Sequence, residues 1–121
     1  MLDKQLAFNR AVAGLRQQQT RSANESGFCM YRGPNNTKCA VGWLIPDDEY
    51  NPEFDNGSGT NLYKVRQHLD PDLGVPDDDD TNFLRSMQRC IHDQLQHDWN
   101  NEDFEARVAA FATDYNLEIP A

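Results

Sequence analysis

The segment DKQLAFNRAVAGLRQQQ, residues 3–19, predicts the fold class of this chain. Its apolar residues recur at intervals of three and four, while lysine, arginine and glutamine fill most of the remaining positions. This spacing places an apolar stripe along one face of an α-helix. We therefore expect an amphipathic helix over 3–19 whose stripe is buried in a core. The stripe consists of Leu2, Leu6, Ala7, Ala11, Val12 and Leu15.

Three further segments have the apolar spacing of a helix. They extend over about 60–69, from about 80 to 96, and over about 101–115. Each begins beside residues that favour the N-cap position, and these are Thr60 or Asn61, Asp80 or Thr81, and Asn100 or Asn101. We therefore expect about four helices in all.

The segment 20–60 interrupts this helical pattern. The residues before the Gly-Pro-Asn-Asn sequence at 33–36 have a β-type composition, and that sequence predicts a chain reversal. The apolar run 38–45 then forms either the partner strand of a short hairpin or a short buried helix. We favour the helix, because Thr37 can cap it and Pro46 would stop it.

Length and composition predict one domain over 1–121, since the chain has only 121 residues and a mass of 13.9 kDa. The expected fold is mainly α: a small bundle of about four helices with an irregular, cysteine-containing insert at 20–60, which includes a possible short β-hairpin. The mean hydropathy is low, at -0.82. Six Phe, four Tyr and two Trp nevertheless supply rings for a core and argue against a disordered chain.

Hydropathy also indicates where the protein resides. No apolar run approaches the ~20 residues of a membrane span, and residues 1–5 lack the apolar stretch of a secretion signal. We therefore expect a cytoplasmic protein with no membrane partner.

Cysteine spacing and acidic patterning predict neither a metal nor a cofactor. The three cysteines are an odd number and are expected to be free thiols in a reducing compartment. Cys29 and Cys39 are too far apart in sequence for a zinc knuckle, and the acidic loops lack the ligand register of a calcium site.

Charge is unevenly distributed along the chain. The net charge of -9 and the isoelectric point near 4.5 argue against direct binding to nucleic acid. Residues 1–40 hold six Lys or Arg against two acids, a net of +4, whereas 41–121 hold five against eighteen, a net of -13. Such a chain can present a basic pocket within an acidic shell, although the acids can equally serve solubility alone.

The most distinctive segment is 29–50, CMYRGPNNTKCAVGWLIPDDEY. It concentrates two thiols, two cations, two tyrosines and three acids in the irregular insert. It resembles the signature of a family of small uncharacterised proteins from tailed phages and prophages, of the form Cys-x-Tyr-Arg, then Lys-Cys-Ala-x-Gly-x-Leu-Ile-Pro-Asp-x-x-Tyr. A later stretch at 88–93, QRCIHD, is also similar to that family.

The resemblance spans nearly the whole chain in order and spacing. It implies a phage or prophage setting and a small product in the host cytoplasm, and it implies no particular activity. Trp43 departs from the pattern, which has a small residue or cysteine at this position.

The polar residues of these two stretches are the candidate binding residues. A pocket for a charged ligand would use arginine as a fork, tyrosine as a stacking face, and glutamine or aspartate as orienting groups. The same residues could instead form a buried polar network that holds the irregular insert onto the helices. The set comprises Tyr31, Arg32, Lys38, Asp47, Tyr50, Gln88, His92 and Asp93.

A cysteine-dependent enzyme is an alternative interpretation. Lys38 and a helix start would favour the thiolate of Cys39, and His92 would act as the base. Asp93 is adjacent to His92 and about 100° away around an α-helix, so Gln88, one turn earlier, is the better partner for the imidazole. Cys39 could equally be a small buried apolar residue.

Three functions therefore compete. The favoured one is binding without turnover, as an inhibitor or modulator of a host protein, in which the acidic residues at 47–55 and 77–80 could mimic nucleic acid. The second is binding of a nucleotide or other small anion through Arg21, Arg32 and Lys38. The third is the cysteine enzyme. The oligomeric state is not indicated by the sequence.

Overall fold

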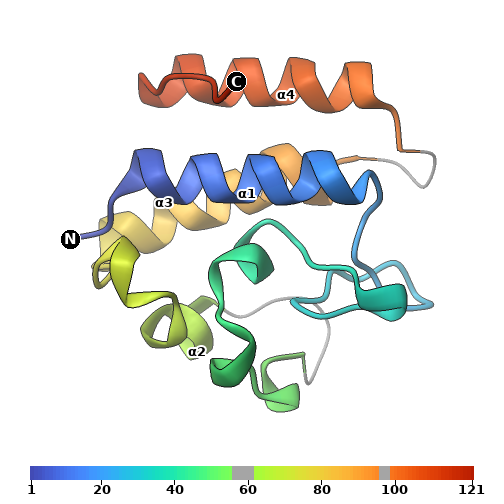
Figure 1. Cartoon of the computed structure of the whole chain (residues 1–121), viewed down its shortest axis with the longest axis vertical. Coiled ribbons are helices and arrows are strands. Elements are labelled where there is room, and N and C mark those ends of the chain that lie inside the picture. The colour runs from blue at the N-terminus through green and yellow to red at the C-terminus, as the bar shows by residue number, and fades with distance from the viewer. Residues whose placement is uncertain (56–61, 96–98) are drawn as a thin grey trace.

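The computed structural model of the chain describes residues 1–55, 62–95 and 99–121. This part of the chain is mainly helical and contains no strand, which confirms the expected fold class. The 20–60 insert runs as an irregular layer beside the helices (Figure 1). No helix in the described part is long and apolar enough to cross a membrane. The four α-helices are α1 Lys4–Gln18, α2 Leu62–Val65, α3 Asp78–Gln88 and α4 Asn101–Tyr115.

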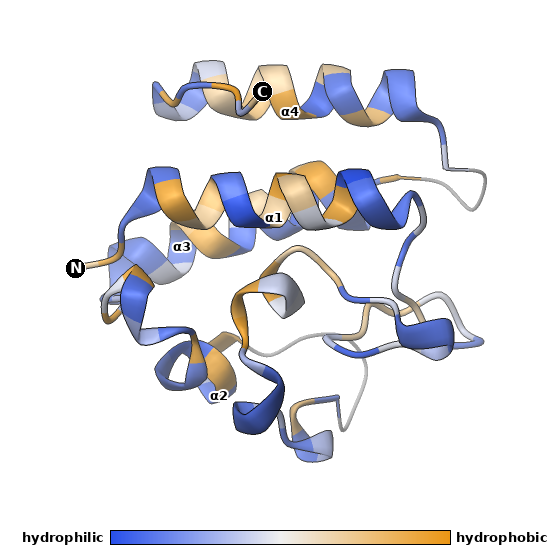
Figure 2. Cartoon of the chain, viewed as in Figure 1, coloured by the Kyte–Doolittle hydropathy of each residue, from blue (hydrophilic) through white to orange (hydrophobic). Residues whose placement is uncertain are grey.

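The apolar stripe of α1 is buried, as its spacing predicts. Figure 1 shows α4 along one side of α1 and α3 behind it. Phe8 of α1 stacks on Phe111 of α4 with ring centroids 5.6 Å apart, and Phe83 of α3 lies 5.4 Å from the same ring. Hydrophobic and hydrophilic residues alternate along α1 in Figure 2, as expected for a helix with one buried face. One core therefore joins the three long helices.

The α3 helix begins earlier than the sequence predicts. Its N-cap is Asp77 rather than Asp80 or Thr81, and Asp77 and Asp80 form a reciprocal capping box. Asp80 is buried, and its carboxylate also accepts a hydrogen bond from the backbone N–H of Leu2 at 2.9 Å. This tertiary contact gives Asp80 a role inside the first turn, which spacing along the chain does not reveal.

The α3 helix does not stay α-helical to its end. Beyond Gln88 it becomes a π-helix, Arg89–Asp93, and residue 96, its expected end, lies outside the described residues. The α2 helix is shorter than expected, because Arg66–His68 is a separate 3-10 helix. Its expected caps, Thr60 and Asn61, also lie outside the described residues.

The insert is held by turns rather than by a hairpin. Its described residues form two isolated β-bridges, one between Ala23 and Cys29 and one between Gly33 and Thr37. The run 38–45 contains a short 3-10 helix, so the helical alternative is the one observed. This helix, Val41–Leu44, is called η2, and the turn Pro34–Asn36 is called η1. Thr37 does not cap η2, because its hydroxyl donates to the carbonyl of Pro34 at 2.8 Å.

Candidate functional site

The predicted binding residues separate into two groups, and Arg32 is the centre of the first. Its guanidinium donates to the carbonyls of Gly42 and Ile45, both at 2.8 Å, and to that of Tyr31 at 3.2 Å. It also reaches the carboxylate of Asp47 at 3.1 Å. Only 15% of the Arg32 side chain is exposed. Arg32 therefore ties together carbonyls at and beside η2; that of Gly42 also accepts the backbone N–H of Ile45 at 3.3 Å.

Asp55, which the sequence analysis did not place in the site, joins the same group. Its carboxylate accepts from the backbone N–H of Tyr31 at 2.7 Å, from that of Arg32 at 3.2 Å, and from the hydroxyl of Tyr50. The ring of Tyr50 also lies 5.0 Å from the Arg32 guanidinium. Burial, reinforced by Asp55, raises the pKa of Tyr50. These contacts link residues 31 and 32 to residues 50 and 55. They therefore hold the two ends of the segment 31–55 together.

Asp47 and Lys38 lie at the exposed edge of this network. The ammonium of Lys38 reaches Asp47 at 3.5 Å and lies 4.6 Å from the centre of the Trp43 ring. Lys38 first, and then Arg32, hold the pKa of Asp47 below its usual range. Arg32 and Lys38 therefore both form an ion pair with Asp47.

The second group contains Gln88, His92 and Asp93, and the structure adds Cys29 to it. One carboxylate oxygen of Asp93, Oδ1, accepts three hydrogen bonds: from the Cys29 thiol at 2.6 Å, from Gln88 Nε2 at 2.8 Å, and from His92 Nδ1 at 2.8 Å. Gln88 Oε1 in turn accepts from the backbone N–H of Val41 at 2.9 Å. The cluster thus connects the end of α3 to η2 and to the 20–30 loop.

The tautomer of His92 follows from its partners. Its Nε2 accepts a hydrogen bond from the backbone N–H of Ser22 at 2.9 Å, so the ring proton is assigned to Nδ1, where it is donated to Asp93. The expectation that Asp93 does not orient His92 is therefore wrong. The two side chains are neighbours in the chain and meet directly, while the π-helix spacing of five residues brings Gln88 onto the same carboxylate.

The thiols near this cluster lack the properties of a nucleophile. Burial first, and then the Asp93 carboxylate, raise the pKa of Cys29 to about 12. Cys39 is fully buried, which raises its pKa strongly, and its sulfur accepts from the backbone N–H of Gly42. The His92 lone pair faces Ser22 rather than either thiol. The arrangement therefore offers no base beside a reactive thiolate.

Cys29, His92 and Asp93 also form a potential metal-binding group. Their Sγ, Nδ1 and carboxylate oxygen all lie within 4.8 Å of one another, and zinc accepts these ligand types. A metal on Nδ1 would require the ring proton at Nε2, because a ligating neutral imidazole keeps its other N–H. That proton would face the N–H of Ser22 across 2.9 Å. The residues present therefore fit a hydrogen-bonded cluster better than a metal centre.

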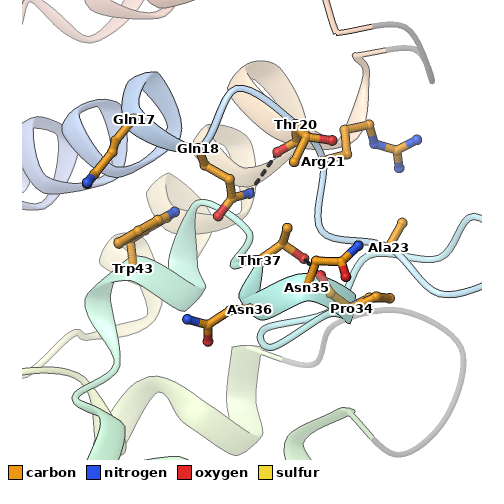
Figure 3. A pocket seen from close by; sticks show the side chains of 10 residues that line it. All are labelled: Gln17, Gln18, Thr20, Arg21, Ala23, Pro34, Asn35, Asn36, Thr37 and Trp43. Carbon is orange, nitrogen blue, oxygen red and sulfur yellow. Dashed lines mark hydrogen bonds between the residues drawn. The ribbon is translucent and has the colours of Figure 1, made fainter.

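The largest groove described lies between the end of α1 and the η1 turn. Its volume is about 530 Å³, and Figure 3 shows its ten lining side chains, none of which is acidic. Arg21 is the one cation among them. Gln18 holds the two walls together by pairing with the backbone N–H and carbonyl of Lys38, at 2.8 and 2.9 Å. The lining residues are Gln17, Gln18, Thr20, Arg21, Ala23, Pro34, Asn35, Asn36, Thr37 and Trp43.

Exposed amide side chains form the rim of this groove. Asn35 and Asn36 both have left-handed backbone conformations, with φ of 59° and 63°, which asparagine tolerates better than most residues. Figure 3 shows Asn36 on one side of the Trp43 indole and Gln17 of α1 on the other. All three amides are exposed, so their donors and acceptors are accessible to a ligand.

Within residues 1–55, 62–95 and 99–121, two buried N–H groups of the groove residues have no hydrogen-bond partner: Nε of Arg21 and Nε1 of Trp43. The Trp43 ring lies so close to α1 at Gly14 that a Cβ on Gly14 would be 2.2 Å from the ring. The sequence analysis named Arg21 but missed Trp43, whose only signal was its departure from the phage-type pattern. It also missed the amides, because Gln and Asn in a loop are typical of any turn.

No family model, curated protein or solved structure matches this chain. The phage or prophage setting and the host partner therefore stay predictions.

Proposed function

We propose that this protein acts by binding, and that the groove between α1 and η1 holds a small polar ligand. One observation carries the proposal: the groove has a volume of about 530 Å³, and its described lining combines exposed amide side chains with the Trp43 ring and contains no carboxylate. The exposed amides at the rim are accessible to a polar ligand.

The remaining lining chemistry supports a polar ligand. Amide side chains both donate and accept, which suits a ligand that carries both kinds of group. In a chain of net charge -9, the lack of a carboxylate among the described lining residues also favours neutral or anionic ligands over cationic ones. Of the three cations that the sequence suggested for an anion site, only Arg21 lines this groove. Arg32 and Lys38 instead pair with Asp47.

Binding is favoured over turnover by the state of the thiols. The pKa of Cys29 and that of Cys39 are both raised, and His92 is oriented toward Ser22. The interaction with a host protein that the sequence analysis expects stays a prediction. The groove could bind a polar group of such a protein or a free small molecule.

The test observes the two tryptophan indoles by ¹H–¹⁵N correlation NMR. A panel of neutral and anionic small molecules, followed by a small-molecule extract of cells, is added to the labelled protein. We expect a ligand to move the Trp43 N–H resonance, because the Trp43 ring lines the groove. The Trp99 indole is the internal control, since it already donates to Asn101 at 2.9 Å. A thermally stabilising ligand that leaves Trp43 unmoved, or an extract that moves neither indole, would contradict the proposal.

A further inference from the structure

We infer that the exposed face of α3 around Arg85 and Arg89 binds an acidic segment of a partner protein, whose carboxylates pair with these two guanidiniums. Neither arginine lines the groove between α1 and η1, so this inference is independent of the proposed function. Its starting point is the way in which the arginines of this chain pair with carboxylates.

Most arginines of this acidic chain form an ion pair within the chain. Arg85 and Arg89 are both exposed, and neither forms an ion pair with any of the described residues, although the chain has 20 acids. The arginines that do pair with an Asp or Glu are Arg10, Arg16, Arg32, Arg66 and Arg107.

Arg85 and Arg89 lie one turn apart on the same face of the helix. The backbone N–H of Arg89 donates to the carbonyl of Arg85, which is the spacing of a regular α-helical turn. At this spacing the two side chains are neighbours, and like charges repel each other and destabilise the helix. Two carboxylates of a partner would turn this repulsion into two attractive pairs.

Tyr63 of α2 extends this face beside Arg85. Its ring is 56% exposed, and it lies 5.6 Å from the guanidinium carbon of Arg85 and 5.0 Å from that of Arg66. Arg66 already pairs with Asp78 at 2.8 Å. A guanidinium beside an aromatic ring keeps its charge and its N–H donors. Tyr63 therefore positions Arg85 without neutralising it.

A hollow of about 200 Å³ adjoins Arg89 and is lined by Ser86, Arg89, Cys90 and Gln94. The carbonyl oxygen of the Gln94 side chain accepts from Arg107 at 3.0 Å, which leaves its NH₂ group for another partner. The hollow thus combines a guanidinium with hydroxyl and amide donors, and no carboxylate is among its described lining residues. This donor set suits a carboxylate side chain.

The spacing of the two arginines favours a peptide over a nucleic acid. Cβ atoms one helical turn apart are separated by about 5–6 Å. Side chains two residues apart on an extended peptide point the same way about 7 Å apart, so two of its carboxylates can meet both arginines. A nucleic acid would instead bring a continuous row of phosphates to a chain of net charge -9, with Asp78 and Asp79 at the start of the same helix.

The first experiment measures binding of a fluorescein-labelled, end-capped hexaglutamate peptide by fluorescence anisotropy. Sodium chloride is kept at about 20 mM, because salt screens exposed ion pairs. We expect saturable binding to the parent protein, weakened about threefold or more by Arg85→Gln and by Arg89→Gln. Lys4→Gln is the matched control, since Lys4 is an exposed cation on α1, and it should weaken binding less.

Three outcomes of this experiment would overturn the inference. The first is no binding of hexaglutamate to the parent protein. The second is a loss in Lys4→Gln as large as that in the two arginine variants, which would show attraction to the charge of the whole molecule. The third is a DNA duplex that binds as tightly as hexaglutamate in the same salt, which would make the partner a nucleic acid.

The second experiment locates the peptide on the parent protein. Unlabelled hexaglutamate at saturation should slow alkylation of Cys90 by iodoacetamide about twofold or more, because Cys90 lines the hollow beside Arg89. Cys29, which contacts Asp93 and does not line the hollow, should react at an unchanged rate. A hexaglutamine peptide should slow neither thiol. An unchanged rate at Cys90, or equal slowing of both thiols, would place the peptide elsewhere and overturn the inference.

Discussion

Arg32 and Arg21 occupy the same irregular insert, yet they use their donors in opposite ways. Arg32 donates to three backbone carbonyls and to Asp47. Arg21 has two long contacts and a buried Nε without a partner. The first arginine therefore holds the fold together, whereas the second contributes few and long hydrogen bonds to it. The comparison teaches that a cation within a distinctive motif is not, for that reason, a binding residue.

The largest effect on stability is expected from Arg32→Ala, which removes the arginine that donates to three backbone carbonyls. Three carbonyls would lose a charged donor, and each such bond contributes about 1.5–3 kcal/mol. We expect the free energy of unfolding in urea to fall by about 3 kcal/mol or more. Arg85→Ala, on the exposed face of α3, is the control and should change it little. A loss for Arg32→Ala no larger than that of the control would show that water satisfies these carbonyls equally well.

A smaller effect is expected from Gly14→Ala, which disturbs the wall of the groove. The added Cβ would lie 2.2 Å from the Trp43 ring, so the indole must move. Such overpacking costs about 1–3 kcal/mol, and the better helix propensity of alanine offsets about 1 kcal/mol of it. We expect a net loss of stability below that of Arg32→Ala, together with a displaced Trp43 indole N–H resonance. An unmoved resonance would contradict the packing of Trp43 on α1.

Asp93→Asn tests the cluster that lies beside Arg21. Burial acts to raise the pKa of Asp93, but hydrogen bonds from His92, Cys29 and Gln88 outweigh it and hold the pKa below its ordinary value. A carboxylate with a lowered folded-state pKa stabilises the fold above its unfolded pKa, about 3.9, and this stabilisation disappears as the pH falls through the folded-state value.

We therefore expect the free energy of unfolding of Asp93→Asn to depend less steeply on pH than that of the parent between about pH 5 and pH 2. Urea unfolding at a series of pH values in this range measures the two slopes. Equal slopes for the variant and the parent would show that Asp93 does not carry this acid sensitivity. The other carboxylates with lowered pKa, such as Asp70 and Asp80, are present in both proteins and cancel in the difference.

The sequence predicted the helices well because each depends on local spacing. The α1 and α4 helices have bounds within a residue or two of the expected ones, and Asn100 is the N-cap of α4, one of the two residues proposed. The start of α3 was wrong because Asp80 is held by Leu2, a contact across most of the chain. The π-helix at Arg89–Asp93 has no signal in the apolar spacing, which continues through it.

The site was harder to predict because its groups are assembled by the insert. Sequence reasoning named His92 and Asp93 but not Cys29, which reaches Asp93 from 64 residues away. It grouped Arg21 with Arg32 by charge alone, since charge along a chain does not show which carbonyls a guanidinium will meet. Only the three-dimensional positions of the carbonyls of Gly42 and Ile45 separate the two arginines.

The smallest effect on stability is expected from Arg21→Ala, and this variant tests the comparison most directly. Its two contacts are long, and its Nε has no partner to lose, so removal of the side chain should change the free energy of unfolding by less than about 1 kcal/mol. Because Arg21 lines the groove, the same variant should weaken the ligand-induced shift of the Trp43 indole resonance. A stability loss as large as that of Arg32→Ala would make both arginines structural and remove the distinction between them. Unchanged stability combined with a weakened Trp43 response is the outcome that a groove residue without a structural role requires.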